Sequence, residues 1–283
     1  MTFLLLAIVC STVVGHVFTL ASRRATGSAG LLLINYAVAA PASVIGMLLH
    51  PAPIQLDGLL PVLLAALLGF LFLFNYLMLA ESIKHMGIAL PVTLMRVSVA
   101  WPVVGSIVLF KEFPHAPTLL ATAAVFLALP LASPQKIDRA VLRGAHSSGL
   151  LQAMLLFIAT GLTELLFKVQ AELHPLANPF VFSSMIFPVA LLFSWLHFRR
   201  SADRIDRDGI ALGAGLGLFN VGSTVFLLLA LHLMQGIVVF PINAAGVIVL
   251  STLSALFIWR ERPTPRQWLF IAIACIAIGF IYH

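Results

Sequence analysis

Long apolar runs constrain this chain more than any other feature of its sequence. A helix needs roughly 20 apolar residues to cross a hydrocarbon core about 30 Å thick. Ten runs of suitable length follow one another, and their continuous rather than alternating pattern favours helices over a membrane β-barrel. The sequence therefore predicts an all-α integral membrane protein with ten transmembrane helices. Their approximate ranges are 2–20, 29–49, 58–80, 86–110, 115–133, 149–170, 179–198, 209–231, 235–259 and 266–282.

The composition agrees with a membrane location and limits the chemistry. Hydrophobic residues make up 61% of the chain and charged residues 9%, which leaves too little polar surface for a soluble globule. Both cysteines, Cys10 and Cys275, lie inside apolar runs, so neither a disulfide framework nor a cysteine-based metal site is expected. No motif of a known enzyme class occurs, and the 9 histidines are scattered. We therefore expect no enzyme activity, no cofactor and no bound metal.

One stretch occurs twice, at residues 87–112 and 236–261. Each copy begins with Gly-Ile, carries a proline shortly afterwards, continues as an apolar run, and ends in a basic residue followed by glutamate. Paired glycine and proline interruptions in corresponding spans typically mark the binding site of a secondary transporter. We therefore predict a helix break or hinge at the glycine and the proline of each copy. These residues are Gly87, Pro91, Gly236 and Pro241.

The duplication divides the chain into two halves. The longest polar stretch joins the fifth and sixth predicted spans, so we assign 1–133 and 149–283 to five-helix repeats and 134–148 to a cytoplasmic linker. Because each half has an odd number of spans, the second half crosses the membrane in the opposite sense to the first. The sequence thus predicts two inverted five-helix repeats, an arrangement that is typical of transporters.

Lysine and arginine residues predict the orientation of the chain. Of the 16 Lys and Arg residues, Arg96 lies inside a span. Only Lys111 and Lys168 lie on one side of the predicted bundle, and all the others lie on the opposite side. The positive-inside rule makes that other side cytoplasmic and places both termini outside, in the periplasm or the extracellular space. The sequence pI of about 9.9 follows from loops that face anionic lipid headgroups, so no nucleic-acid partner is expected.

The chain resembles the drug/metabolite transporter superfamily, EamA type. It has two five-span halves, its fourth and ninth spans are interrupted by glycine and proline, and a [KR]-E-x-P turn precedes its fifth and tenth spans. We expect these turns to be structural, with the glutamate near the N-terminus of the incoming helix. The resemblance implies a common architecture for amino-acid exporters, cation carriers and metabolite exchangers. Many relatives have cytoplasmic termini, whereas the charges of this chain predict the reverse.

Arg96 lies near the predicted midplane of the fourth span, where a cation costs roughly 2.5–3.5 kcal/mol on insertion scales. A cost of this size implies a partner. Arg96 either faces a central cavity and binds a carboxylate or phosphate of the substrate, or forms a structural ion pair, for instance with Glu164. The matching position of the second repeat is Ala245 or Gly246, so Arg96 does not belong to the shared scaffold.

Glu164 lies in the sixth span, with Lys168 one helical turn later. One interpretation is an internal salt bridge near the outer interface, with Lys168 extending outwards. The other makes Glu164 a proton-coupling carboxylate or the anchor for a substrate ammonium. Both interpretations remain open from the sequence.

Three further residues complete the candidate site. Asn243 and Thr93 each follow a repeated proline by two positions, where an interrupted backbone would expose polar groups to a cavity. Trp101 is a candidate aromatic wall for a substrate, although a lone tryptophan in a span more often serves packing.

The sequence therefore predicts a secondary transporter of the bacterial inner (plasma) membrane that works by alternating access. The leading hypothesis for the substrate is a small metabolite, either an amino-acid-like zwitterion or an organic anion, with proton coupling as an open question. The alternative is an uncoupled facilitator, or an exporter of organic cations or drugs. The expected partners are the small-molecule substrate, the lipid bilayer and, if transport is coupled, protons, with the chain acting as a monomer or a homodimer.

Overall fold

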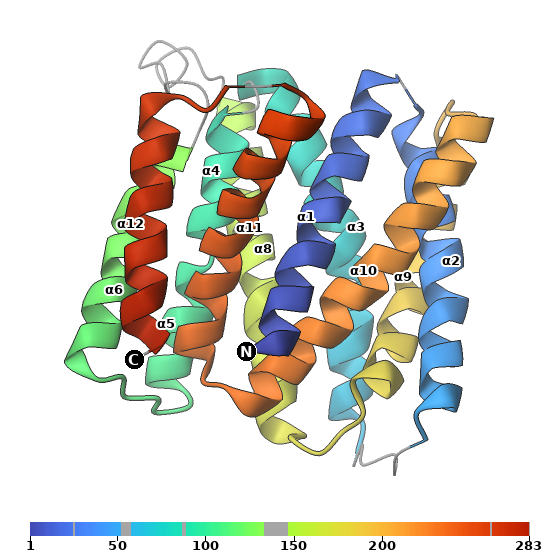
Figure 1. The fold of residues 1–283 in the computed structure, drawn as a ribbon. Helices are drawn as coiled ribbons and strands as arrows, with labels where there is room; N and C mark the ends of the chain where they lie inside the picture. The colour runs from blue at the N-terminus through green and yellow to red at the C-terminus, as the bar shows by residue number, and fades with distance from the viewer. Residues whose placement is uncertain (25, 52–57, 87–88, 133–146, 261, 283) are drawn as a thin grey trace. The chain divides into compact units, whose positions relative to one another are not determined.

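The structure of the protein is a computed structural model that describes residues 1–24, 26–51, 58–86, 89–132, 147–260 and 262–282. The described residues form helices joined by short connections, and no β-strand occurs among them (Figure 1). Most of the predicted linker and the predicted hinge residue Gly87 lie outside the described residues. The all-helical class predicted from the sequence is confirmed for the part of the chain that is described.

The helices follow the order of the predicted spans. Among the described residues, eight segments are long and apolar enough to cross a membrane, counting residues 90–108 as one, and two shorter apolar helices cover 116–132 and 265–280. The bounds are α1 Thr2–Arg23, α2 Ser28–Leu49, α3 Leu60–Met86, α4 Ala89–Val97, α5 Ala100–Val108, α6 Ala116–Ala128, the 3₁₀ helix η1 Leu129–Ala132, α8 Ser147–Leu173, α9 Pro179–Arg200, α10 Arg207–Leu233, α11 Gly236–Ile258 and α12 Pro265–Tyr282.

Exposed apolar side chains indicate that hydrocarbon surrounds these segments, and hydrocarbon favours helices. Leu127 is 82% exposed and Phe257 is 79% exposed, which is favourable only where hydrocarbon replaces water as the solvent. In hydrocarbon an unpaired backbone N–H or C=O costs several kcal/mol, and a helix pairs them within one segment. The chain is therefore a multi-pass membrane protein.

One compact unit consists of residues 1–73 and 169–233. In this unit α1 packs on α10, and α2 packs on both α9 and α10. Small residues of α10 permit this packing, because a Cβ atom at Gly217 would lie 2.5 Å from the carbonyl oxygen of Asn35, and a Cβ atom at Gly213 would lie 2.7 Å from Cβ of Ile34. Substitution of either glycine would push α10 away from α2.

The other compact unit consists of residues 74–168 and 234–283. Here α12 packs on α6, η1 and α11, while α11 also packs on α5 and α6. Helices from both sequence halves contribute to each unit, so the compact units do not coincide with the predicted repeats at 1–133 and 149–283. All the described candidate site residues belong to this second unit.

The predicted fourth span is divided into two helices at residues 98–99. Pro102 accounts for the break, because it has no N–H to donate to the carbonyl of Ser98 and its ring clashes with that carbonyl. The Ser98 carbonyl accepts a hydrogen bond from the N–H of Trp101 instead, at 2.9 Å. The backbone is therefore interrupted in the middle of a span.

The same strained turn closes both copies of the repeated stretch. Lys111, after α5, has φ 54°, and Arg260, after α11, has φ 56°; no other non-glycine residue among those described has a positive φ. This left-handed conformation costs an L-residue roughly 1–2 kcal/mol. Both side chains are exposed, so the backbone geometry, rather than a side-chain contact, defines the turn.

We expect Lys111→Gly and Arg260→Gly to stabilise the protein, because glycine adopts positive φ without the clash of a Cβ atom. Lys111→Val should destabilise it by about 1 kcal/mol or more, because a β-branched side chain is poorly tolerated in this conformation. Thermal unfolding of the purified variants in detergent measures both effects. A valine variant as stable as the wild type would contradict the turn geometry.

Candidate functional site

Arg96 lies in the last turn of α4, directly before the break in the fourth span. Carbonyl groups at a helix C-terminus carry partial negative charge, which favours a cation at this place. The Arg96 side chain is half-buried and interacts electrostatically with the carboxylate of Glu164 on α8. Two features thus stabilise the guanidinium inside the membrane: the end of a broken helix and an acidic neighbour.

Glu164 is also half-buried, and its Oε2 atom is buried without a hydrogen-bond partner. A buried acceptor of this kind is unusual in a folded protein, because it loses hydration without compensation. It marks a place where a water molecule or a ligand is able to donate. The structure therefore brings the two predicted residues Arg96 and Glu164 together and leaves an acceptor for a third group.

Lys168 does not extend outwards as the sequence suggested. It is 0% exposed and forms an ion pair with Glu112, which lies in the turn after α5. A fully buried ammonium requires such a partner, because desolvation of an unpaired charge is costly. The partner is far away in the sequence, which is why the neighbouring Glu164 was the expected one.

Glu112 has a different role from the one that its turn predicted. Its carboxylate accepts hydrogen bonds from the N–H groups of Gly236 at 3.1 Å and Ile237 at 3.0 Å, the first two residues of α11. We expected this glutamate to act at the N-terminus of the following helix, α6, but its carboxylate hydrogen-bonds to the N-terminus of α11 instead. The N-cap residue of α6 is His115, which makes no side-chain cap hydrogen bond.

A hydrogen-bonded group of polar side chains lies on the same helix as Glu164. Nδ2 of Asn75 on α3 donates to Oγ1 of Thr163 at 2.9 Å, and Oγ1 of Thr160 donates to Oδ1 of Asn75 at 3.3 Å. Thr160 lies one turn before Glu164, so the two side chains share a face of α8. The polar surface of α8 therefore extends over more than one turn.

Asn243 supplies a second unpartnered acceptor. It is half-buried on α11, and its Oδ1 atom is buried without a hydrogen-bond partner. The helix is continuous through Pro241, so the predicted break is not observed there. Pro91 lies in the first turn of α4, followed by the buried Thr93, and the break comes later, at residues 98–99.

Helix geometry places Asn243 and Glu164 on the facing sides of α11 and α8. A Cβ atom at Gly236 would lie 2.9 Å from Cε of Lys168, so the start of α11 packs directly on α8. Glu164 lies about 6 Å along its helix from Lys168, and Asn243 lies about 10 Å along its helix from Gly236. Spacings of four and seven residues keep each side chain on the face of its starting residue.

Trp101 packs on the same region of α8. A Cβ atom at Gly161 would lie 2.6 Å from Cγ of Trp101, and the indole ring lies 6.4 Å from the ring of Phe157. The side chain is nevertheless 43% exposed. Trp101 therefore packs on α8 at Gly161, one turn before Glu164, and remains partly exposed.

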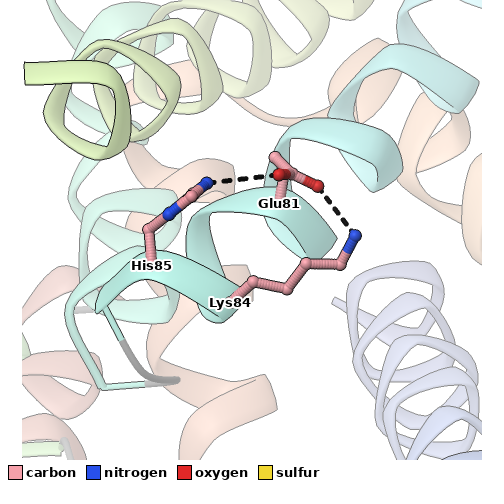
Figure 2. A network of polar contacts seen from close by, with 3 residues as sticks. All are labelled: Glu81, Lys84 and His85. Atoms are coloured by element: carbon pink, nitrogen blue, oxygen red, sulfur yellow. Dashed lines mark hydrogen bonds and ion pairs between the residues drawn. The ribbon is translucent and has the colours of Figure 1, made fainter. Parts of the chain in front are cut away.

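A further charged group lies at the end of α3 and is separate from these residues. Figure 2 shows Glu81 between Lys84 and His85, with Lys84 Nζ at 2.8 Å and His85 Nε2 at 3.2 Å from its carboxylate oxygens. All three side chains have substantial exposure, as expected for residues where a helix leaves the membrane. Glu81 is thus a carboxylate outside the candidate site, and it serves as a control for Glu164.

Within the described residues, no group of three or more His, Cys, Asp or Glu side chains could hold a metal ion. The candidate site instead consists of one guanidinium, one carboxylate and one amide, carried by three helices. Such a set binds polar groups of a small molecule through charge and hydrogen bonds.

The long apolar helices define a multi-pass membrane protein. The family model described as the EamA-like transporter family matches residues 147–283. This match confirms the resemblance to the drug/metabolite transporter superfamily.

Two individual proteins are also similar to this chain. An uncharacterized protein of Haemophilus influenzae is 23% identical over 227 residues, which cover 79% of this chain and 75% of that protein. A protein of known crystal structure matches with a TM-score of 0.75 at 13% sequence identity, covering 100% of this chain and 98% of that chain. At this level of identity the second likeness establishes the fold alone.

We expect Gly161→Ala to destabilise the protein by about 1–3 kcal/mol, because the added methyl group meets the base of the Trp101 side chain, which has little freedom to move. The matched control is Gly279→Ala in α12, where nothing lies within 4 Å of the added atom. Thermal unfolding in detergent should show a lower midpoint for the first variant and an equal or higher midpoint for the second. Equal midpoints for both variants would contradict the close contact between α5 and α8.

Proposed function

We propose that this protein is a secondary transporter that moves a small metabolite across the bacterial inner membrane by alternating access. The favoured substrate is an amino-acid-like zwitterion, and an organic anion is the related possibility. The observation that carries this proposal is the pair Arg96 and Glu164 inside a membrane span, together with the unpartnered acceptors Glu164 Oε2 and Asn243 Oδ1.

Each group of the site has a function in this proposal. The planar guanidinium of Arg96 binds a carboxylate in a bidentate manner. The unpartnered oxygen atoms of Glu164 and Asn243 accept hydrogen bonds from an ammonium group. Thr93 and Trp101 contribute a hydroxyl group and an aromatic surface to the wall of the site. Opposite charges at the two ends of the substrate thus meet opposite charges of the protein.

The packing of the helices supports two inverted repeats. Three pairs of spans with equal rank in the two halves pack together: α2 on α9, α5 on α11, and α6 on α12. A twofold relation between the halves predicts this pairing. The positive φ angles of Lys111 and Arg260, at matching positions of the repeat, support the same relation.

The broken fourth span supports a site at this level of the membrane. Interrupted helices of transporters expose polar backbone groups and charged termini to a cavity at mid-membrane depth. In this proposal the break after Arg96 supplies such a terminus. The continuous α11, which carries Asn243, supplies the less flexible opposite wall.

An exporter of organic cations is the second candidate. The same two acceptors, Glu164 Oε2 and Asn243 Oδ1, would also attract an organic cation that has no carboxylate. In that case Arg96 would serve only to pair with Glu164. The two candidates therefore differ in what the loss of Arg96 does to substrate affinity.

Transport into proteoliposomes tests the proposal with three labelled probes: L-leucine, succinate and tetraphenylphosphonium. We expect uptake of leucine, and we expect Arg96→Gln to weaken its apparent affinity by tenfold or more, as loss of a charged hydrogen bond of about 1.5–3 kcal/mol implies. Glu164→Gln should abolish substrate-driven proton movement, read with an enclosed pH-sensitive dye. Glu81→Gln, which removes a carboxylate outside the site, should leave both readings unchanged.

Each variant can contradict a separate part of the proposal. Unchanged affinity in Arg96→Gln would remove the anion-binding role of Arg96. Proton movement that survives Glu164→Gln would remove the coupling role of Glu164. Uptake of tetraphenylphosphonium alone would favour the exporter of organic cations.

We also propose that the termini lie outside the cytoplasm, on the basis of the charge distribution. In a variant without Cys10 and Cys275, a cysteine at Ser201 should resist a membrane-impermeant maleimide in intact cells. A cysteine at Leu176, which is 74% exposed in the connection on the opposite side, should react under the same conditions. The reverse pattern of labelling would overturn the assigned orientation.

A further inference from the structure

Glu112 joins three separate parts of the chain. Its carboxylate forms an ion pair with Nζ of Lys168 on α8 and accepts hydrogen bonds from the N–H groups of Gly236 and Ile237 at the start of α11. Glu112 itself follows α5, and only 8% of it is exposed. We call this set of four residues, Glu112, Lys168, Gly236 and Ile237, the α11 anchor.

The start of α11 depends on this anchor for its hydrogen bonds. The first four N–H groups of a helix have no partner within the helix. At α11 the N–H group of Val238 donates to the carbonyl of the N-cap residue Gln235 at 3.0 Å, and the N-cap side chain makes no cap hydrogen bond. The N–H groups of the first two helical residues, Gly236 and Ile237, donate to the Glu112 carboxylate.

The charges of the anchor are balanced within it. A carboxylate is favourable at a helix N-terminus, where the helix dipole is positive. The ammonium of Lys168, 0% exposed, neutralises the remaining charge of the carboxylate. Because these groups are buried and hydrogen-bonded, the contact has little freedom to slide.

Close packing at Gly236 adds a geometric constraint. A Cβ atom at this position would meet Oγ of Ser106 on α5 and would lie 2.9 Å from Cε of Lys168. Only glycine permits α11 to start this close to both helices. The anchor therefore caps α11 and also determines its axial position relative to α8, which we call its height.

The candidate site lies one to two helical turns from the anchor on the same faces. Glu164 comes one turn before Lys168, and Asn243 comes two turns after Gly236. A change of height at the anchor is transmitted along rigid helices to these two side chains.

We propose that Glu112 is a positioning residue of the candidate site, which sets the height of Asn243 relative to Glu164 by holding the start of α11 against α8. The functional part of this inference rests on the proposed transport function. Glu112 does not contact the substrate. It acts through the relative placement of two residues that do.

Three variants separate positioning from helix capping. Glu112→Gln removes the ion pair and one acceptor of the α11 anchor. Adding Gln235→Asp supplies a new N-cap carboxylate for α11, since aspartate is a preferred N-cap residue, but leaves α11 without its ion-paired connection to Lys168. The double variant Glu112→Gln with Lys168→Met removes both buried charges together and serves where the single variant folds poorly.

The first readout is the KM and the maximal rate for whichever of leucine, succinate or tetraphenylphosphonium the wild type transports. We expect Glu112→Gln to raise KM on the order of tenfold with little change in maximal rate, as misplaced binding groups do. Adding Gln235→Asp should restore the melting temperature and leave KM raised. If Glu112→Gln with Gln235→Asp had the KM of the wild type, the proposal would be overturned, because a cap on α11 would then be sufficient.

The second readout does not require transport. Spin labels at Ile158 on α8, 45% exposed, and Phe257 on α11, 79% exposed, report the placement of these helices through their distance distribution. Glu112→Gln should shift or broaden this distribution, and so should the double variant Glu112→Gln with Lys168→Met. Glu81→Gln should leave it unchanged. An unchanged distribution overturns the positioning role. Failure of the wild type to transport any probe would instead count against the proposed function alone.

Discussion

The structure depends on one constraint: within hydrocarbon, backbone and charged groups need partners inside the protein, because no water is available to solvate them. Helices satisfy this constraint along their length and fail at their ends. Among the described residues, the buried Glu112 and the half-buried Arg96 accordingly lie at helix ends. Glu112 satisfies the first N–H groups of α11, Lys168 balances that carboxylate, and Arg96 stands at the C-terminal end of α4.

Two groups of buried polar residues differ in how completely they are satisfied, and the difference suggests different roles. In the α11 anchor each oxygen of Glu112 has at least one donor, which favours a single rigid arrangement. In the candidate site Glu164 Oε2 and Asn243 Oδ1 have no donor. Orphaned acceptors of this kind are costly, so they persist where a ligand or water completes them. On α8 and α11 the protein thus combines a hydrogen-bonded anchor with two unpartnered acceptors of the candidate site.

Local sequence signals predicted the elements well, and long-range contacts less well. The order of the helices follows from hydropathy, which each segment carries by itself. The break in the fourth span follows from Pro102, a signal present in the sequence, although Pro91 and Pro241 seemed better placed because they recur in both copies. The partner of Lys168 is Glu112, 56 positions away. The rule that favours pairs one helical turn apart pointed to Glu164 instead, because that rule contains no information on which helices are neighbours.

The sequence by itself determined that this chain is an all-helical membrane protein with a stretch that occurs twice and an arginine inside a span, because apolar run length, periodicity and intramembrane charge are properties of single segments. Only the tertiary structure decided which groups meet. It brought Arg96 close to Glu164, buried Lys168 with Glu112, and placed the Glu112 carboxylate at the start of α11 rather than at its own turn. The physical reason is that a buried charge is stabilised by its neighbours in space, and the sequence specifies those neighbours only through the packing of the whole unit.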